Sequence, residues 1–243
     1  MALVTGAGRG IGRGCALELA RAGAHLVISD VNLPNAEAVA REVAALGRQT
    51  LAIGVDVSSE DQVNEMVRQA VERFSRVDIL VNNAGIVTTG RVTEITVETW
   101  DRTMAVNLKG VFLCSKAVFP LMIRQQDGRI INIASVAGKR GGGLHGNSCY
   151  AASKGGVIAF TKSLAREGGP YNVRVNAITP ALIQTDMLDG LTQDKFEQII
   201  EALPLRRAGT PQDVAAAACF LASDASAFMT GEIMDVDGGL MMD

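Results

Sequence analysis

Short apolar runs alternate with amphipathic stretches along almost the whole chain. Each run is rich in Val, Ile, Leu and Ala and is bounded by Gly, Asp, Asn or Ser, which is typical of buried strands ending in turns. The stretches between the runs have the apolar spacing of helices. Seven runs predict strands, at Met1–Thr5, His25–Asp30, Thr50–Val57, Asp78–Gly85, Gly128–Ser135, Asn172–Ile178 and Gly231–Gly239.

Start signals mark several of the helices between these strands. Ser59-x-x-Gln62 has capping-box spacing, so a helix should begin there and continue to about Phe74. Thr210-Pro211 combines an N-cap residue with proline at the first helical position. Further helices are expected up to Arg21, over about Asn35–Leu46, over about Thr96–Met122 and from the neighbourhood of Tyr150.

Strands that alternate with helices predict repeated βαβ units and therefore a parallel sheet with helices on both faces. No Pro-rich or Gly/Ser-rich linker and no internal repeat divides the chain. We therefore expect one α/β domain over residues 1–243, with a doubly wound parallel sheet of about seven strands.

The composition is that of a globular protein able to bury a large core, with 48% hydrophobic and 20% charged residues. The net charge is -3 and basic residues form no block, which argues against nucleic acid or an anionic membrane as a partner. No uninterrupted apolar run is long enough to predict a membrane span, and the first residues lack the pattern of a secretory signal.

The four cysteines are scattered along the chain, without a C-x-x-C pair, and there are only two histidines. This pattern argues against a zinc site or a disulfide framework, so no metal is expected. Cys149 is next to Tyr150, but a plain core cysteine is the simpler interpretation. A reducing cytoplasm is the expected compartment.

A glycine cluster follows the first predicted strand and opens the first predicted helix. Gly6, Gly8, Gly10 and Gly12 stand where a phosphate can approach bare backbone and meet the amides of a helix N-terminus. Such clusters also occur in simple turns, because glycine tolerates positive φ. The strand before and the helix after this cluster favour a Rossmann-type dinucleotide site.

Asp30, at the end of the second predicted strand, supports that interpretation. A carboxylate there can accept hydrogen bonds from the adenosine ribose hydroxyls and would repel a 2'-phosphate, so NAD is expected rather than NADP. Arg9 weakens this preference, since it could reach a 2'-phosphate if Asp30 turned away. The simpler alternative is an aspartate that caps a helix.

Tyr150 and Lys154 are four residues apart and would share one face of a helix. A free phenol has a pKa of about 10, and a nearby cation lowers it by favouring phenolate. The pair could therefore act as an acid/base, although a tyrosine beside a solvated lysine is equally compatible with this spacing alone.

Taken together, these segments resemble the short-chain dehydrogenase/reductase family over nearly the full length of the chain. The resemblance is carried, in family order, by TGAGRGIG (Thr5–Gly12), Asp56-Val57, NNAG (Asn82–Gly85), Asn107, Ser135, YAASK (Tyr150–Lys154), NAITPALIQTDM (Asn176–Met187) and DGG (Asp237–Gly239).

The resemblance implies a hydride transfer between a nicotinamide and a secondary alcohol or ketone. It implies Tyr150 as the acid/base, Lys154 as the cation that lowers its pKa and binds the nicotinamide ribose, Ser135 as the ligand of the substrate oxygen and Asn107 as the anchor of a proton-relaying water. The implied cofactor contacts are Gly6, Arg9, Gly10, Ile11, Asp30, Asp56, Val57, Asn83, Ala84, Gly85, Tyr150, Lys154, Pro180, Ile183 and Thr185.

Two departures from the family pattern concern the substrate side. Ala181 follows Pro180 where the family usually has glycine, and its methyl could narrow the pocket. The interval between the family serine and tyrosine is slightly longer than usual and forms a glycine-rich loop. This loop carries Lys139, Arg140 and His145, which could contact an anionic substrate or simply be solvated.

The segment from about 184 to 204 is expected to form a substrate loop. Its apolar residues predict either an apolar pocket wall or the inner face of a packed helix; they are Met187, Leu188, Leu191, Phe196 and Ile199.

Three functions remain open at this point. The preferred one is NAD-dependent dehydrogenation of a polyol, sugar or hydroxy acid. The alternative is a reductase of the 3-oxoacyl-(acyl-carrier-protein) type, which the chain closely resembles but which mostly uses NADPH, against the charge of Asp30. A non-catalytic dinucleotide sensor is the remote third possibility, since a sensor needs no intact catalytic set.

Two predicted helices, at about Thr99–Met122 and Ser153–Glu167, carry apolar or small residues on more than one face. One face must cover the sheet, so the second needs another partner. Family members commonly pair these helices between subunits, which implies a homotetramer. The alternative is that the subunit's own core absorbs both faces.

Overall fold

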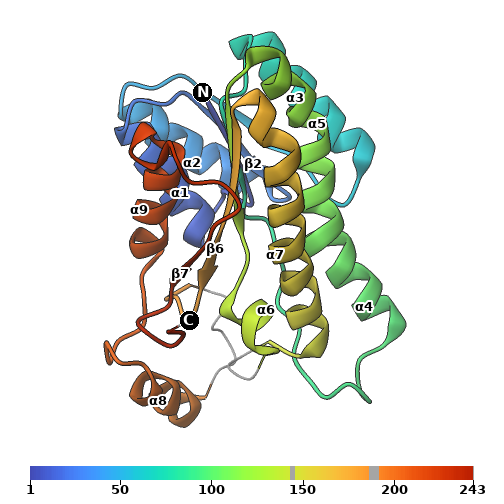
Figure 1. Ribbon diagram of the computed structural model, residues 1–243, viewed down its shortest axis with the longest axis vertical. Helices are drawn as coiled ribbons and strands as arrows, with labels where there is room; N and C mark the ends of the chain where they lie inside the picture. The colour runs from blue at the N-terminus through green and yellow to red at the C-terminus, as the bar shows by residue number, and fades with distance from the viewer. Residues whose placement is uncertain (143–145, 186–191, 243) are drawn as a thin grey trace.

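The computed structural model describes residues 1–142, 146–185 and 192–242. Its centre is a parallel sheet in the order β3-β2-β1-β4-β5-β6-β7 (Figure 1). The strands are β1 (Ala2–Thr5), β2 (Leu26–Asp30), β3 (Thr50–Gly54), β4 (Ile79–Asn82), β5 (Gly128–Ile133), β6 (Val173–Pro180) and β7 (Ile233–Val236). The expected doubly wound α/β sheet is therefore confirmed.

Helices cover both faces of this sheet. On one face α1 (Gly10–Arg21), α2 (Leu33–Ala45) and α9 (Pro211–Ala222) enclose one apolar core, and on the other α3 (Glu60–Phe74), α5 (Gly110–Gln125) and α7 (Ser148–Gly168) enclose a second (Figure 1). The remaining helical segments are α4 (Val97–Met104), η1 (Ala105–Lys109), α6 (Val136–Arg140), η2 (Gly169–Tyr171), α8 (Gln193–Ala202) and η4 (Asp224–Ser226).

Both β2 and β4 flank β1, so the connections leave the central strand in opposite directions. In such sheets a crevice opens beyond the carboxyl ends of the strands at this switch point. The predicted strands at Thr50–Val57 and Asp78–Gly85 extend too far, because β3 ends at Gly54 and β4 at Asn82. The residues that follow leave the sheet and line the crevice instead.

The predicted helix over Thr96–Met122 is three segments in the structure. Between α4 and α5 lies η1, one turn of π-helix that contains Asn107. The Asn107 side chain bonds to Ile86 and Ser153, outside its own helix. Such π-turns occur frequently at functional sites.

The capping box predicted at the start of α3 is half formed. Ser59 Oγ accepts a hydrogen bond from the Gln62 N–H at 3.5 Å, but Gln62 Oε1 accepts from the Asp56 N–H at 2.9 Å and not from Ser59. A complete box is present at α9, where Thr210 and Asp213 cap each other.

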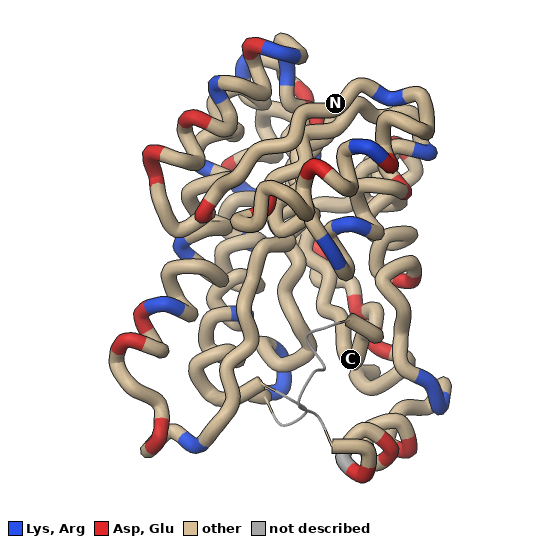
Figure 2. Tube along the Cα trace, turned by 180° about the vertical axis from the view of Figure 1, so that it is seen from behind, with Lys and Arg blue, Asp and Glu red and all other residues tan. Residues whose placement is uncertain are grey.

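The stretch Val97–Gln125 is long and apolar enough to cross a membrane, which the sequence pattern did not predict. Half of its most apolar window is nevertheless buried inside the protein, as in a core helix. Over the described residues, acidic and basic positions are interspersed along the helices (Figure 2).

Candidate active site

Two adjoining cavities open at the carboxyl ends of the strands. The first is lined by Gly6, Arg9, Gly10, Ile11, Asp30, Val31, Val55, Asp56, Val57, Asn83, Ala84, Gly85, Ile86, Arg102, Val106 and Thr185. The second is lined by Ile11, Asn83, Gly85, Val87, Ile133, Ala134, Ser135, Val136, Ala137, Gly146, Tyr150, Lys154, Pro180, Ala181, Leu182, Ile183 and Thr185. The two share Ile11, Asn83, Gly85 and Thr185 and therefore form one continuous cleft.

Backbone alone forms the floor of the first cavity at the glycine loop. Gly6 has φ of +60°, and a Cβ built on it would lie 2.8 Å from Ala84 Cα. A Cβ on Gly12 would lie 2.2 Å from Gly6 O. Arg9, the N-cap residue of α1, places no side-chain acceptor on the first amides of this helix. The loop therefore has the shape and the free helix N-terminus that suit a pyrophosphate.

Asp30 stands where the second strand meets this loop. Its Oδ2 accepts a hydrogen bond from Gly8 N and its Oδ1 from Asn32 N, both at 2.9 Å. An ionised carboxylate has about four lone-pair sites, so acceptor capacity is left for ligand hydroxyls. The two backbone bonds hold the carboxylate at the cavity wall, in the place expected for a ribose contact.

Asp56 and Val57 line the far part of the first cavity. Burial raises the pKa of the Asp56 carboxyl, but hydrogen bonds from Ser58 and Arg102 outweigh it and lower that pKa overall. Arg102 Nη1 lies 3.0 Å from Asp56 Oδ2 and comes from α4. The sequence analysis did not identify Arg102, because the spacing of Asp56 and Arg102 along the chain does not indicate that α4 reaches this cavity.

The second cavity contains the acid/base candidates Ser135, Tyr150 and Lys154. Lys154 is only 4% exposed, and its Nζ donates a hydrogen bond to Ile133 O at 2.7 Å. The same Nζ lies 5.9 Å from the centroid of the Tyr150 ring, within cation–π range. Burial lowers the pKa of the Lys154 ammonium to about 8.

The sequence led us to expect a lowered pKa for Tyr150, whereas the structure raises it. Burial raises the pKa of the Tyr150 phenol, and a hydrogen bond with Ser135 opposes the rise without reversing it. Desolvation disfavours the charged form of each group, so the phenol keeps its proton while the ammonium holds its proton less firmly. At neutral pH, Tyr150 is therefore a proton donor.

Asn107 does not line either cavity but lies directly behind the cleft. Its Nδ2 donates to Ile86 O and to Ser153 Oγ, and its Oδ1 accepts from Ile86 N at 2.8 Å. A Cβ on Gly85 would lie 3.3 Å from Asn107 Oδ1 and 3.5 Å from Lys154 Nζ. Gly85 therefore lies close to both the Asn107 amide and the Lys154 ammonium, and a side chain at this position would contact both.

Gly146 is a cavity residue that sequence reasoning did not identify. A Cβ on Gly146 would lie 2.2 Å from Tyr150 Cδ1, so the ring packs directly on this backbone. The lengthened loop before Tyr150 was the only sequence signal, and it did not indicate which residue meets the ring.

Of the cations in that loop, Lys139 is not available to an anionic substrate. Its Nζ lies 2.7 Å from Asp235 Oδ2 of β7, and both side chains are largely buried. Arg140 is exposed at the end of α6 and does not line either cavity. His145 lies outside the described residues.

Ala181 lines the second cavity, as its departure from glycine led us to expect. In the substrate segment, Phe196 and Ile199 of α8 pack in a small cluster with Leu182 and Ala208. The two residues therefore form the inner face of a packed helix. Met187, Leu188 and Leu191 lie outside the described residues.

The chain is similar to several known reductases and dehydrogenases. Residues 6–241 match the family model described as enoyl-(acyl carrier protein) reductase. A 3-oxoacyl-(acyl-carrier-protein) reductase from Synechocystis sp. is 44% identical over 244 residues, covering 100% of this chain and 97% of that protein. The enzyme of that name from Thermotoga maritima is 40% identical over 240 residues, covering 99% of this chain and 97% of that protein.

Solved structures are similar over the same length. Levodione reductase superimposes with a TM-score of 0.92 at 36% identity, covering 98% of this chain and 96% of that one. A Sinorhizobium meliloti structure described as a short-chain alcohol dehydrogenase gives a TM-score of 0.94 at 35% identity, covering 98% and 95%.

The raised pKa of Tyr150 can be measured directly, because the chain has only two tyrosines. In a Tyr171→Phe variant, tyrosinate absorbance reports Tyr150 alone. Without cofactor, we expect its midpoint to lie above the value of about 10 for a free phenol. The Tyr150→Phe, Tyr171→Phe double variant should show no transition. A midpoint below that of free tyrosine would show that the charge of Lys154, and not burial, dominates.

Proposed function

Since the chain belongs to the short-chain dehydrogenase/reductase family and is an NAD(P)-dependent oxidoreductase of CH–OH and keto groups, we propose that it reduces 3-oxoacyl thioesters, with NADH as the preferred hydride donor. The main support is the set of 3-oxoacyl-(acyl-carrier-protein) reductases that match it over nearly their full length. The polyol, sugar or hydroxy-acid dehydrogenase preferred from the sequence has no comparable support from its relatives.

The chemistry of the second cavity supports a neutral keto substrate. Around Ser135 and Tyr150, its described lining consists mainly of aliphatic and backbone groups, and Lys154 is its one cationic side chain. That ammonium is bonded to Ile133 O and lies beneath the tyrosine ring. Among the described residues, no second cation lines the cavity to pair with a substrate carboxylate, as a hydroxy acid would require.

The first cavity would hold the adenosine half of a dinucleotide: the amides of the glycine loop would bind the pyrophosphate, and Asp30, Asp56 and Val57 would bind the adenosine. When bound, the cofactor supplies the hydride. Pro180, Ile183 and Thr185 line the end of the cleft shared with Tyr150 and would hold the nicotinamide there.

The chain's own residues then handle the oxygen of the substrate. Ser135 would bind the carbonyl oxygen and hold it next to the phenol of Tyr150. Tyr150 is a phenol at neutral pH, and burial raises its pKa further; it would donate a proton to that oxygen as negative charge develops on it. General acid catalysis of this kind contributes roughly 10²–10⁴-fold to the rate.

Lys154 and Asn107 would support this proton transfer from behind. The Lys154 ammonium stabilises phenolate after Tyr150 has given up its proton, and it would also bind the nicotinamide ribose. Its pKa of about 8 makes it able to pass a proton on near neutral pH. A water anchored near Asn107 would complete the relay to solvent, as the family resemblance implies.

The position of Asp30 supports NADH over NADPH. Its carboxylate is held at the wall of the first cavity by two backbone N–H groups and cannot turn away without breaking them. A 2'-phosphate at this place would be repelled by the fixed negative charge.

A kinetic panel tests the proposed reaction. With NADH, kcat/KM for acetoacetyl-CoA should exceed that for polyol or hydroxy-acid oxidation with NAD by more than about tenfold. Crotonyl-CoA, an enoyl thioester, tests for the enoyl reductase activity that the family model describes. Tyr150→Phe is the matched control and should lose turnover while still binding NADH in calorimetry. Faster turnover of a polyol or of crotonyl-CoA would replace the proposed substrate.

Cofactor choice should change when the charge of Asp30 is removed. Asp30→Ala should raise the ratio of kcat/KM for NADPH to that for NADH by about tenfold or more, since it removes a repulsion worth more than about 1.4 kcal/mol. Asp30→Asn removes the charge and nearly keeps the shape, although its single amide oxygen can accept from only one of the two backbone N–H groups. Calorimetric affinities for NAD and NADP provide a readout without turnover. If the wild-type protein already prefers NADP, the role given to Asp30 is wrong.

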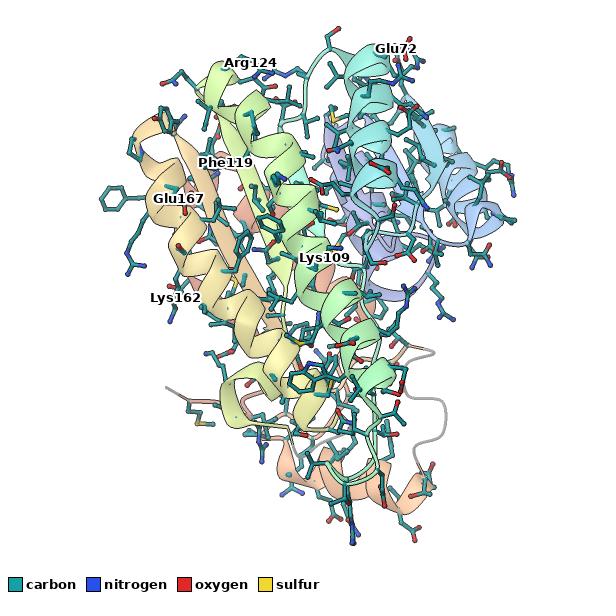
Figure 3. All side chains as sticks on the ribbon, turned by 90° about the vertical axis from the view of Figure 1, so that its right-hand side faces the viewer. Glu72, Lys109, Phe119, Arg124, Lys162 and Glu167 are labelled. Carbon is teal, nitrogen blue, oxygen red and sulfur yellow. The ribbon has the colours of Figure 1, made fainter. Side chains whose placement is uncertain are left out.

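We also propose that the protein assembles as a cytoplasmic homotetramer through α5 and α7, which lie side by side on one flank of the molecule (Figure 3). Phe112 of α5 is 43% exposed and contacts Phe160 of α7 edge to face, with ring centroids 6.3 Å apart. Only half of the most apolar window within Val97–Gln125 is buried inside the subunit. A second copy, related by a two-fold axis, would cover what remains.

Light scattering tests this assembly. The wild-type protein at micromolar concentration should give roughly four times the 25.5 kDa chain mass, as expected for closed two-fold symmetry applied twice. Phe112→Glu should lower that mass by placing a charge in the apolar contact. Val92→Glu, at a residue 73% exposed in a loop, is the matched control and should leave the mass unchanged. A fully active monomer would refute the proposal.

A further inference from the structure

Asn147 is the residue immediately before α7 and is only 9% exposed. Its Oδ1 accepts a hydrogen bond from the Tyr150 N–H at 3.0 Å. It is therefore the N-cap of the helix that carries Tyr150 in its first turn. An N-cap side chain satisfies an amide that the helix itself leaves unpaired.

The same residue also binds a segment far away in the sequence. Its backbone N–H donates to Thr88 O at 2.9 Å, and its Nδ2 donates to Thr89 O at 3.1 Å. Thr88 Oγ1 donates back to Asn147 Oδ1 at 2.9 Å. Three hydrogen bonds thus join the start of α7 to the connection between β4 and α4.

Residues 86–89 of this connection, here called the wall segment, begin with two residues that line the cleft. Ile86 lines the first cavity and Val87 the second. Asn107 binds the backbone N–H and C=O of Ile86, at the beginning of the wall segment. Asn147 binds Thr88 and Thr89 at its end, so two buried asparagines hold the segment from both sides.

We propose that Asn147 is a positioning residue that fixes the distance between Tyr150 and the wall segment, and with it the width of the second cavity. One amide oxygen, Oδ1, receives both the Tyr150 N–H and the Thr88 hydroxyl, so the phenol and the wall share a single anchor. Asn147 lines neither cavity and acts through Tyr150 and Val87. The kinetic part of this inference rests on the proposed reductase function.

The competing explanation is that Asn147 only caps α7. A serine at this position distinguishes a capping role from a positioning role. Serine and asparagine are nearly equivalent at the N-cap position. Asn147→Ser therefore keeps an acceptor for the Tyr150 N–H, whereas it removes the amide N–H that reaches Thr89 O. Asn147→Ala removes both functions.

The test combines hydrogen–deuterium exchange with steady-state kinetics on acetoacetyl-CoA. In Asn147→Ser, the first turn of α7 should keep its wild-type protection, while peptides covering the wall segment should exchange about tenfold faster, as expected when a local opening loses about 1.4 kcal/mol. The kcat should fall by about tenfold or more, because small displacements of catalytic groups are costly. NADH affinity should stay near the wild-type value.

Thr96→Ala is the matched control, because Thr96 caps α4 through Thr99 N and lines neither cavity. It should lower the thermal midpoint by the loss of a cap without changing kcat. Wild-type wall protection and kcat in Asn147→Ser would overturn the proposal, as would an equal loss of kcat in Thr96→Ala. If the wild-type protein turned over no thioester, the proposed function would fail, and the exchange data alone would still decide the role of Asn147.

Discussion

The seam between β1 and β4 is the constraint on which the rest of the site depends. Parallel strands cannot close this seam at their carboxyl ends, because the connections from them run to opposite faces of the sheet. Thr5 and Asn83 bridge it: Thr5 Oγ1 accepts from Asn83 N and Ala84 N, and Asn83 Nδ2 donates to Thr5 O and Gly6 O. These bonds fix the glycine loop against the end of β4 and so form the floor of the cleft.

Helix α7 packs closely beside this floor and buries the side chains of Tyr150 and Lys154. It can approach α6 closely only because Gly138 lacks a side chain; a Cβ there would lie 2.6 Å from the Lys154 carbonyl carbon. Close packing excludes water from Lys154 and Tyr150, which lowers the pKa of one group and raises that of the other. Burial therefore sets the direction in which the pKa of Tyr150 shifts.

The sequence predicted those features of the fold and of the site that depend on local pattern and on short spacings. Strand positions, the glycine loop and Asp30 all follow from periodicity and turn chemistry within one βαβ unit. It did not predict the Lys139–Asp235 pair, whose partners are 96 residues apart, or the anchoring of Thr88 by Asn147. Gln62 shows the same limit at short range, since its side chain had two backbone amides within reach and binds Asp56 instead of Ser59. Such choices depend on the tertiary positions of the competing donors.

The charge pattern of the cleft connects cofactor state with the direction of proton transfer. The first cavity is lined by the carboxylates Asp30 and Asp56 together with Arg9 and Arg102, whereas Lys154 is the one charged side chain lining the described part of the second. Burial keeps Tyr150 a phenol by raising its pKa, so in the proposed reduction it would give a proton to the substrate oxygen. A positive charge in that buried space would favour phenolate, because electrostatic effects grow as water is excluded. In the proposed reaction the charge held beside Tyr150 would therefore decide whether it acts as an acid or as a base.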